Sequence, residues 1–511
     1  MPFRSILFEA TESITDIDGR TPPEFFADLH LDQIVDSLTA GKDEYNLKPF
    51  FYVPLRHLSS IRYRQDILHD FENHSLLAHI QSFAQRMRAM RESLVQTGKL
   101  SYKLQKQSWL LSAADLYCST VRRLTRDVTI VSPSSRGMTE FCAFLKAYID
   151  SAEFTSLVTE TEKLRADLSR IQYCLYIHGT RITVGQYEPQ ADYGAEVLRV
   201  FDKFKQAAPK DYKFDFSTWL EMNHVEAAIL DRVALLFPEI FAALEDYFNR
   251  HRDFVDPMIK TFDREVQFYI ACIEHIERYK KLGLQFCYPT VTDQSKEVSG
   301  HDVFDLALAN NSLSTQKLVI TNDFYLKDPE RIFVVSGPNQ GGKTTFARTF
   351  GQLHYLASIG CPVPGKEARL FLFDDLFTHF EREEDLRNLS GKLEDDLLRI
   401  HSILEKATAD SILIMNESFV STTLADALFL SKQIMYQIIQ RDMLCVSVTF
   451  LDELASLGKT TVSMVSMVEP ENSIQRTFKI VRRPADGLAY AAVLAEKYQL
   501  TYENVKRRIQ P

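Results

Sequence analysis

The apolar positions of the amino-terminal half recur at helical spacing. Residues 32–167 read as mostly helical, and one clear stripe consists of Leu110, Ala114, Tyr117, Val121 and Leu124. Two further stripes follow, one over residues 225–247 that Pro238 interrupts and one over residues 262–276 that ends near Gly283. Because residues three and four apart share a face of a helix, these stripes predict core helices, with a kink or short break at Pro238.

A different period separates these helical blocks. Apolar residues alternate over 171–177 and again at Ile182 and Val184, with His178-Gly179-Thr180 between the two runs. Alternation on either side of a short glycine-containing segment predicts a β-hairpin near residues 168–188, inserted between long helices. The pattern fits a projecting functional element and a plain structural hairpin equally well.

The carboxy-terminal half has a different pattern of apolar residues. Short β-rich runs at 332–335, 411–415 and 444–448 alternate with helical segments. Such alternation predicts a parallel sheet flanked by helices. The fold class expected for the whole chain is therefore multidomain, with a mainly α-helical region followed by an α/β domain.

Composition narrows the class of protein further. Only 18 glycines and 18 prolines occur in 511 residues, and this shortage of turn-forming residues favours long helices. Acidic residues outnumber basic ones by 69 to 59, which excludes a generally cationic coat for nucleic acid but leaves a local basic groove open. The seven dispersed cysteines form no CxxC pair, so neither a disulfide framework nor a zinc site is expected. With no signal peptide and no apolar run of about 20 residues, we expect a cytoplasmic protein without a membrane span.

The strongest chemical signal is a glycine-rich segment between a predicted strand and a predicted helix. It fits the pattern G-x-x-x-x-G-K-[ST] and consists of Gly337, Pro338, Asn339, Gln340, Gly341, Gly342, Lys343, Thr344 and Thr345. Glycines let backbone N–H groups turn toward phosphate oxygens, and the helix start adds its dipole. Lys343 would place a charge on the β- and γ-phosphates, and the Thr344 hydroxyl would bind Mg²⁺. The segment therefore predicts an ATP-binding loop.

A second predicted strand, at 411–415, ends in Asn416-Glu417. In ATPases with such a loop, this place carries an acid that binds Mg²⁺ and a glutamate that activates the attacking water. Glu417 fits the role of general base, whereas Asn416 is neutral and would be a weaker metal ligand. The alternative is a strand end that is merely capped by polar residues.

A third, shorter motif lies between these two. Leu389-Ser390-Gly391-Lys392 resembles the LSGG signature of ABC-type ATPases, which reaches the γ-phosphate in the other subunit of a dimer. The resemblance implies that Ser390 and Gly391 act in trans. An ordinary helix cap, for which serine is well suited, is the alternative.

Taken together, these motifs resemble those of the MutS family. The segment 335–345 resembles the family's TGPNMGGKST, and 322–326 is similar to its N-D/P-x-x-L motif. Downstream, residues 359–364 resemble the family's IG-x-x-VP motif. Residues 486–489, together with Ala491-Ala492, resemble its YGLAVA motif. The resemblance implies a helical core, lever and clamp region at residues 1–282, followed at 283–511 by a P-loop ATPase domain of the ABC type. It also implies carboxy-terminal helices that dimerise the ATPase domain.

The chain departs from the family pattern at several functional positions. Asn416-Glu417 stands where the family has DE, and Thr449-Phe450 stands where it has T-H, so a ring that senses the γ-phosphate is missing. Val319 replaces an adenine-stacking aromatic residue. We find neither an amino-terminal mismatch-reading domain nor its F-x-E motif, and we therefore expect recognition of DNA structure rather than of mismatches.

The resemblance thus implies a homodimeric ATPase that uses ATP-driven closure to bind branched or otherwise distorted DNA, in repair or recombination. ATP and Mg²⁺ are the expected cofactors. Two alternatives stay open. One is an ABC- or SMC-type ATPase that acts on a protein partner, and the other is a nucleotide-gated DNA-binding module that has lost hydrolysis.

Overall fold

The computed structural model describes residues 3–9, 16–188, 199, 222–315, 318–382, 391–469, 472–484, 499–502 and 505–506. The chain divides into two compact units that interleave along the sequence. The helical unit comprises Met1–Phe3, Asn73–Pro133 and Met138–Asp263. The sheet unit comprises Arg4–Glu72, Ser134–Gly137 and Arg264–Pro511. Segments 4–72 and 264–282, which precede the boundary expected after residue 282, therefore belong to the sheet unit.

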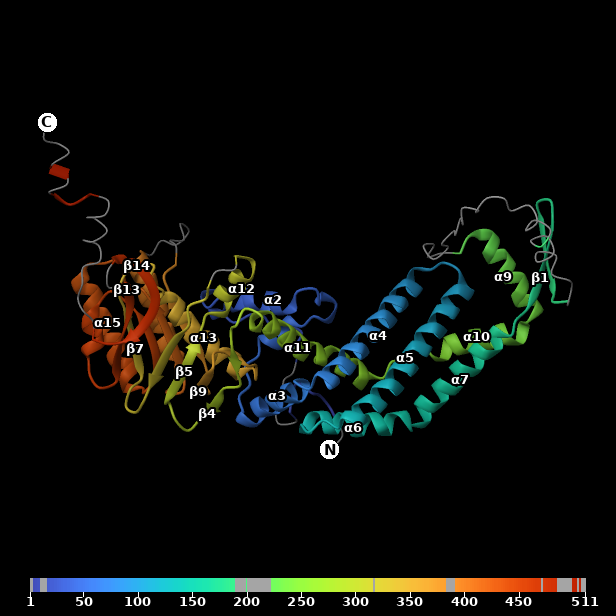
Figure 1. Cartoon of the computed structure of the whole chain (residues 1–511), viewed down its shortest axis with the longest axis horizontal. Helices are drawn as coiled ribbons and strands as arrows, with labels where there is room; N and C mark the ends of the chain where they lie inside the picture. The colour runs from blue at the N-terminus through green and yellow to red at the C-terminus, as the bar shows by residue number, and fades with distance from the viewer. Residues whose placement is uncertain are drawn as a thin grey trace. The chain divides into compact units, whose positions relative to one another are not determined.

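The helical unit is built on long helices. They are α4 (His74–Lys99), α5 (Lys103–Val131), α6 (Arg136–Ile149), α7 (Ala152–Ser169), α9 (His224–Leu236), α10 (Pro238–Arg250) and the start of α11 (Pro257–Lys280). Helices α4 and α5 lie side by side (Figure 1). The whole predicted stripe of α5, from Leu110 to Leu124, is buried. The break expected at Pro238 is confirmed, because α9 ends at Leu236 and Pro238 is the first residue of α10.

The predicted hairpin is formed by β1 (Tyr173–His178) and β2 (Arg181–Gln186). The strands are antiparallel, with Ile177 opposite Ile182, and Gly179 takes a positive φ of 60° in the turn. Most side chains of both strands are exposed, including Ile177 at 66%. Alternation therefore identified the strands, although it does not mark a buried face here.

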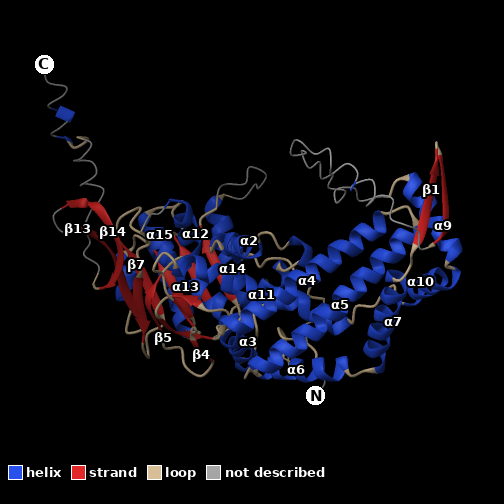
Figure 2. Ribbon diagram, turned by 45° about the vertical axis from the view of Figure 1, so that its right-hand side comes forward, coloured by secondary structure: helices blue, strands red, loops and turns tan. Residues whose placement is uncertain are grey.

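The sheet unit is organised around a six-stranded sheet in the order β10-β11-β12-β7-β13-β14. Three of its strands, β7, β13 and β14, are labelled in Figure 2. Its strands are β7 (Ile332–Ser336), β10 (Leu376–Phe380), β11 (Ile412–Asn416), β12 (Leu444–Val448), β13 (Thr461–Glu469) and β14 (Asn472–Arg482). Neighbouring strands are parallel except β13 and β14, which are antiparallel. The three apolar runs that predicted parallel strands thus correspond to β7, β11 and β12.

Smaller sheets complete this unit. A four-stranded sheet has the order β4-β9-β5-β6, and a two-stranded sheet pairs β3 with β8. These strands are β3 (Phe286–Cys287), β4 (Thr290–Thr292), β5 (Val298–Val303), β6 (Asn322–Leu326), β8 (Val363–Pro364) and β9 (Glu367–Phe371). The helices are α1 (Phe25–Asp28), α2 (Leu31–Thr39), α3 (Leu58–Phe71), α12 (Leu306–Thr315), α13 (Lys343–Ser358), α14 (Lys392–Lys406) and α15 (Leu424–Gln440), with short 3₁₀ turns η1 (Asp43–Tyr45), η2 (Lys48–Phe51) and η5 (Asp452–Ser456).

Helices cover both faces of the six-stranded sheet, which explains why its central strands are continuously apolar. On one face, Leu413 and Met415 of β11 pack in a core that includes residues of α14 and α15. On the other face, Ile414 meets α13 so closely that a Cβ on Gly351 would lie 2.7 Å from its Cδ1. This packing fixes α13, and with it the loop that precedes α13. Within the described ranges, no helix is long and apolar enough to cross a membrane.

Candidate functional site

Three parallel strands bring the candidate residues to one edge of the sheet. The loop Gly337–Gly342, called here the glycine-rich loop, follows β7, while Glu417 follows β11 and Thr449 follows β12. Backbone bonds tie these ends together, since Thr449 N donates to Val335 O (3.0 Å) and Glu417 N donates to Val448 O (2.9 Å). In open α/β sheets, ligands bind at the carboxyl ends of the strands. The candidate site therefore lies where this topology places binding sites.

The glycine-rich loop needs glycine for steric reasons. Gly337 and Gly342 have positive φ values of 118° and 93°. A Cβ on Gly341 would lie 2.2 Å from Ser466 Oγ, and that hydroxyl donates a hydrogen bond to Gly341 O (2.7 Å). Helix α13 then begins at Lys343 without a side-chain cap. Its first N–H groups are therefore available to an anion, which the helix dipole also favours.

Lys343 is buried at the centre of the site, with 4% of its side chain exposed. Its Nζ donates to Gly337 O (2.9 Å), lies 3.9 Å from Glu417 Oε1 and sits 3.7 Å from the centre of the Phe450 ring. Burial lowers the pKa of Lys343 to about 8, while the carboxylates of Glu417 and Asp452 act in the opposite direction. The ammonium group therefore contacts a carbonyl, a carboxylate and an aromatic ring of the protein, and its position beside the glycine-rich loop suits it to an anionic ligand.

The predicted metal-binding pair is also brought together. Thr344 Oγ1 donates to Asn416 Oδ1 at 3.0 Å, and Glu417 follows with a positive φ of 52° and a side chain that is 27% exposed. A hydroxyl and an amide oxygen at this distance fit a hard cation that keeps several of its waters. No group of three or more His, Cys, Asp and Glu side chains suited to a metal ion occurs among the described residues.

The other predicted site residues lie around this centre or outside the described ranges. Pro338 is buried and Thr345 half-buried, whereas Asn339 and Gln340 are exposed on the loop. Gly391 is the N-cap of α14 and forms no side-chain cap bond. Ser390 lies outside the described residues, and so does the carboxy-terminal segment 485–498 that carries the predicted dimerisation motif.

Several residues near the site could not be predicted from the sequence. Ser466 on β13 holds the glycine-rich loop, and Arg476 on β14 donates to Asn339 O (3.2 Å). His379 on β10 contacts Ser418, which follows Glu417 directly. None of the three lies in a recognisable motif, because each acts through pairing between distant parts of the chain.

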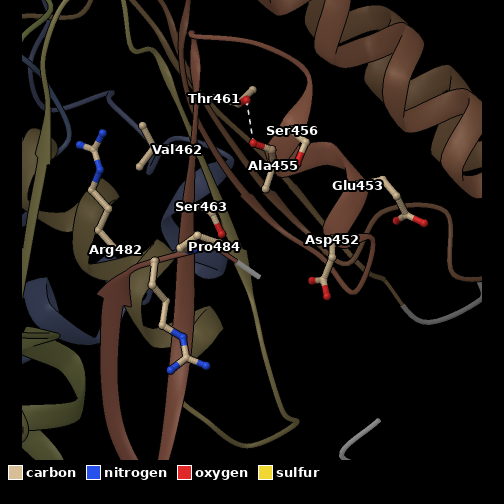
Figure 3. A pocket seen from close by; sticks show the side chains of 10 residues that line it. Asp452, Glu453, Ala455, Ser456, Thr461, Val462, Ser463, Arg482 and Pro484 are labelled. Carbon is tan, nitrogen blue, oxygen red and sulfur yellow. Dashed lines mark hydrogen bonds between the residues drawn. The ribbon is translucent and has the colours of Figure 1, made fainter. Parts of the chain in front are cut away.

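A separate pocket of about 890 Å³ lies along β13, β14 and η5 (Figure 3). Asp452 and Glu453 of η5 line it together with Arg482 and Arg483. Arg482 already forms an ion pair with Glu330, so its charge is compensated. Apart from Asp452, whose carboxylate favours the charged form of Lys343, this pocket shares no described feature with the candidate site.

Comparisons with known proteins all point to MutS and related mismatch repair proteins. A family model described as MutS domain V matches residues 333–499. The DNA mismatch repair protein MutS of Halalkalibacterium halodurans is 27% identical over 53% of this chain and 30% of its own length. The DNA mismatch repair protein MutS of Thermotoga neapolitana is 26% identical over 60% of this chain and 41% of its own length. Human Msh3, also described as a DNA mismatch repair protein, is 28% identical over 31% of this chain and 14% of its own length. The matched part of the chain thus spans less than half the length of these relatives.

Proposed function

Because this chain belongs to the MutS family, we propose that it binds ATP at the glycine-rich loop and hydrolyses it. The observation that carries the proposal is the position of Lys343. Its buried ammonium group lies between the loop carbonyl of Gly337 and the carboxylate of Glu417, at the uncapped start of α13. A triphosphate is the ligand whose charge and shape satisfy the loop N–H groups, the helix dipole and the lysine together.

Each residue of the site then has a chemical task. The loop N–H groups and Lys343 hold the phosphates in place and neutralise their charge. Thr344 and Asn416 would hold Mg²⁺, which would supply neutralisation of the charge that develops during phosphoryl transfer. The carboxylate of Glu417 accepts a proton from the attacking water as general base. Glu417 Oε1 lies 3.9 Å from Lys343 Nζ, so the proposed base is beside the charge that would mark the γ-phosphate position.

The proposal extends to assembly and to DNA. Two copies would form composite sites, with Ser390 and Gly391 of one copy facing the nucleotide of the other. The sheet unit, which contains residues 283–511, would act as the ATPase domain, and its closure on ATP would move the helical unit around DNA. The exposed β1–β2 hairpin would serve as the clamp. Branched or otherwise distorted DNA, read by shape and phosphate contacts, is the proposed ligand in repair or recombination.

A second candidate is a DNA-binding module that ATP gates without being hydrolysed. Two observations favour it. Asn416 is neutral where a carboxylate would bind Mg²⁺ more strongly, and the Phe450 ring occupies one side of Lys343. Asn416 would weaken the metal site used in catalysis more than nucleotide binding, and Phe450 stands where the family has a histidine ring that senses the γ-phosphate.

The test combines phosphate release with DNA binding by the full-length chain. Steady-state phosphate release above that of a Glu417→Gln control supports the ATPase, whereas ATP binding without release supports the gated module. A panel of linear, mismatched, branched and single-stranded DNA, with and without ATP at several salt concentrations, tests the DNA ligand. Preference for branched DNA that depends on ATP is the expected result. Absence of salt-dependent DNA binding would leave an ATPase with a protein partner.

A further inference from the structure

The turn that carries Glu417 has an unusual backbone. Both Glu417 and Phe419 adopt the left-handed region, with φ values of 52° and 62°. Residues other than glycine rarely adopt this backbone conformation, which persists only where the surrounding structure stabilises it. Phe419 is 1% exposed and anchors one end of the turn, while the Glu417 N–H anchors the other by its bond to Val448 O. Ser418 lies between these anchors.

Ser418 is held by a buried histidine. His379 of β10 is 1% exposed, and its Nδ1 lies 3.0 Å from Ser418 Oγ while its Nε2 lies 3.2 Å from Asp396 O. Burial, with the charge of nearby Arg399, lowers the pKa of His379 to about 4, so the ring is neutral near pH 7. Since the Asp396 carbonyl only accepts, Nε2 carries the single proton and Nδ1 accepts from the Ser418 hydroxyl.

The hydrogen bonds that run from Ser418 through His379 end at Asp396 on α14. Asp396 is in the second turn of that helix, whose N-cap is Gly391. Two more contacts join the same turns to the residues at the end of β10. Arg399 donates to Phe380 O (3.0 Å), and Lys392 pairs with Glu381 (2.5 Å). The start of α14 is therefore attached to β10, and through His379 to the turn that carries Glu417.

We propose that His379 is a positioning residue for Glu417, which it links to α14. This inference rests on the proposed function, in which Glu417 is the general base and Gly391 at the start of α14 faces the partner's nucleotide. His379 is buried and acts through Ser418 rather than on the reacting atoms. It holds Ser418 in place and thereby orients the carboxylate of the neighbouring Glu417. Because His379 also contacts Asp396 of α14, this orientation depends on the position of α14.

The test compares His379→Ala, Ser418→Ala and the double variant in the full-length chain, with Ser411→Ala as the matched control. Ser411 is a buried, hydrogen-bonded serine next to the opposite end of β11. We expect each single variant to lower the single-turnover hydrolysis rate about tenfold, the effect of one lost buried hydrogen bond, with ATP affinity within about twofold of wild type. The double variant should be no slower than the slower single variant, because both remove the same bond. His379→Asn keeps an acceptor near the Nδ1 position and should recover part of the rate.

The outcomes separate this inference from the proposed function. If the wild type hydrolyses ATP and both single variants do so at the same rate, the role of His379 is overturned, while the proposed ATPase stands. If the single variants lose ATP affinity and thermal stability along with the hydrolysis rate, and His379→Asn recovers none of that rate, His379 has a purely structural role. If the wild type binds ATP without hydrolysing it, the proposed hydrolysis fails, and the positioning role fails with it.

Discussion

The carboxyl ends of β7 and β11 belong to one sheet, yet they match the chemistry of an ATPase to different degrees. At the end of β7, the glycines, Lys343 and Thr344 are all of the type and geometry that phosphate binding requires. At the end of β11, a neutral Asn416 contacts Thr344, and Glu417 is held in a left-handed turn. Under the proposed function, nucleotide binding and hydrolysis rest on separate strand ends, so one can weaken while the other is kept.

The largest effect is expected from Glu417→Gln, which removes the charge but keeps the shape. Turnover should fall about 10²- to 10⁴-fold, the range for loss of a general base, while bound ATP and the closed dimer accumulate. Phosphate release and size-exclusion chromatography with ATP measure the two effects, and Glu453→Gln, an exposed glutamate of the same unit, is the control. Unchanged turnover would remove Glu417 from the catalytic role.

A smaller effect, on binding, is expected from Gly341→Ala. The added Cβ would lie 2.2 Å from Ser466 Oγ, so the glycine-rich loop must shift. ATP affinity should fall about tenfold to hundredfold, as for other overpacked sites, and Ser466→Ala in the same chain should restore part of it. Gly458→Ala is the matched control, because the nearest atom to its Cβ would be 4.0 Å away. Wild-type affinity in the Gly341 variant would show that phosphate does not enter this loop.

Phe450→Ala should act in the opposite direction. The ring lies 3.7 Å from Lys343 Nζ and competes with phosphate for the ammonium group. Its removal should tighten ATP binding by about two- to tenfold, in line with a cation–π contact at a half-exposed ring. Phe429→Ala, an exposed ring on α15, controls for the loss of an aromatic side chain. Weaker binding would mean that Phe450 contacts the nucleotide instead.

The smallest effect is expected from Asn416→Asp, which sharpens the contrast between the two strand ends. A carboxylate beside Thr344 should lower the Mg²⁺ concentration for half-maximal turnover by about two- to fivefold, since Mg²⁺ prefers anionic oxygen. A titration of turnover with Mg²⁺ measures this shift. If both the Mg²⁺ requirement and the rate stay unchanged, Asn416 does not face the metal, and Glu417 loses its closest support as base.

The sequence predicted those features that depend on neighbouring residues. The buried strand β7 reads as a continuous apolar run, and the glycine-rich loop follows it within the same short segment. Local periodicity also placed the buried stripe of α5 and the break at Pro238. It was less reliable on α9, where only Val233 of the predicted stripe is buried and Val225 is 41% exposed.

Features that depend on tertiary pairing could not be read from the sequence. Ser466 meets Gly341 across 125 positions, and His379 meets Ser418 across 39. The membership of segment 4–72 in the sheet unit has the same origin, since buried Arg64 donates to Ile359 O across 295 positions. No pattern of apolar residues or turn formers encodes such contacts, because they follow from how the helices pack on the sheet.

The most direct test of the account is a titration of the wild-type chain and Lys343→Ala with ATP and Mg²⁺, followed by calorimetry. The ammonium group cannot be replaced by loop N–H groups alone, so the variant should bind ATP at least about 100-fold more weakly, the effect of losing charged hydrogen bonds. Lys459→Ala, an exposed lysine of the same unit, should bind like the wild type. Equal ATP affinity of wild type and Lys343→Ala would contradict the assignment of the glycine-rich loop as the nucleotide site.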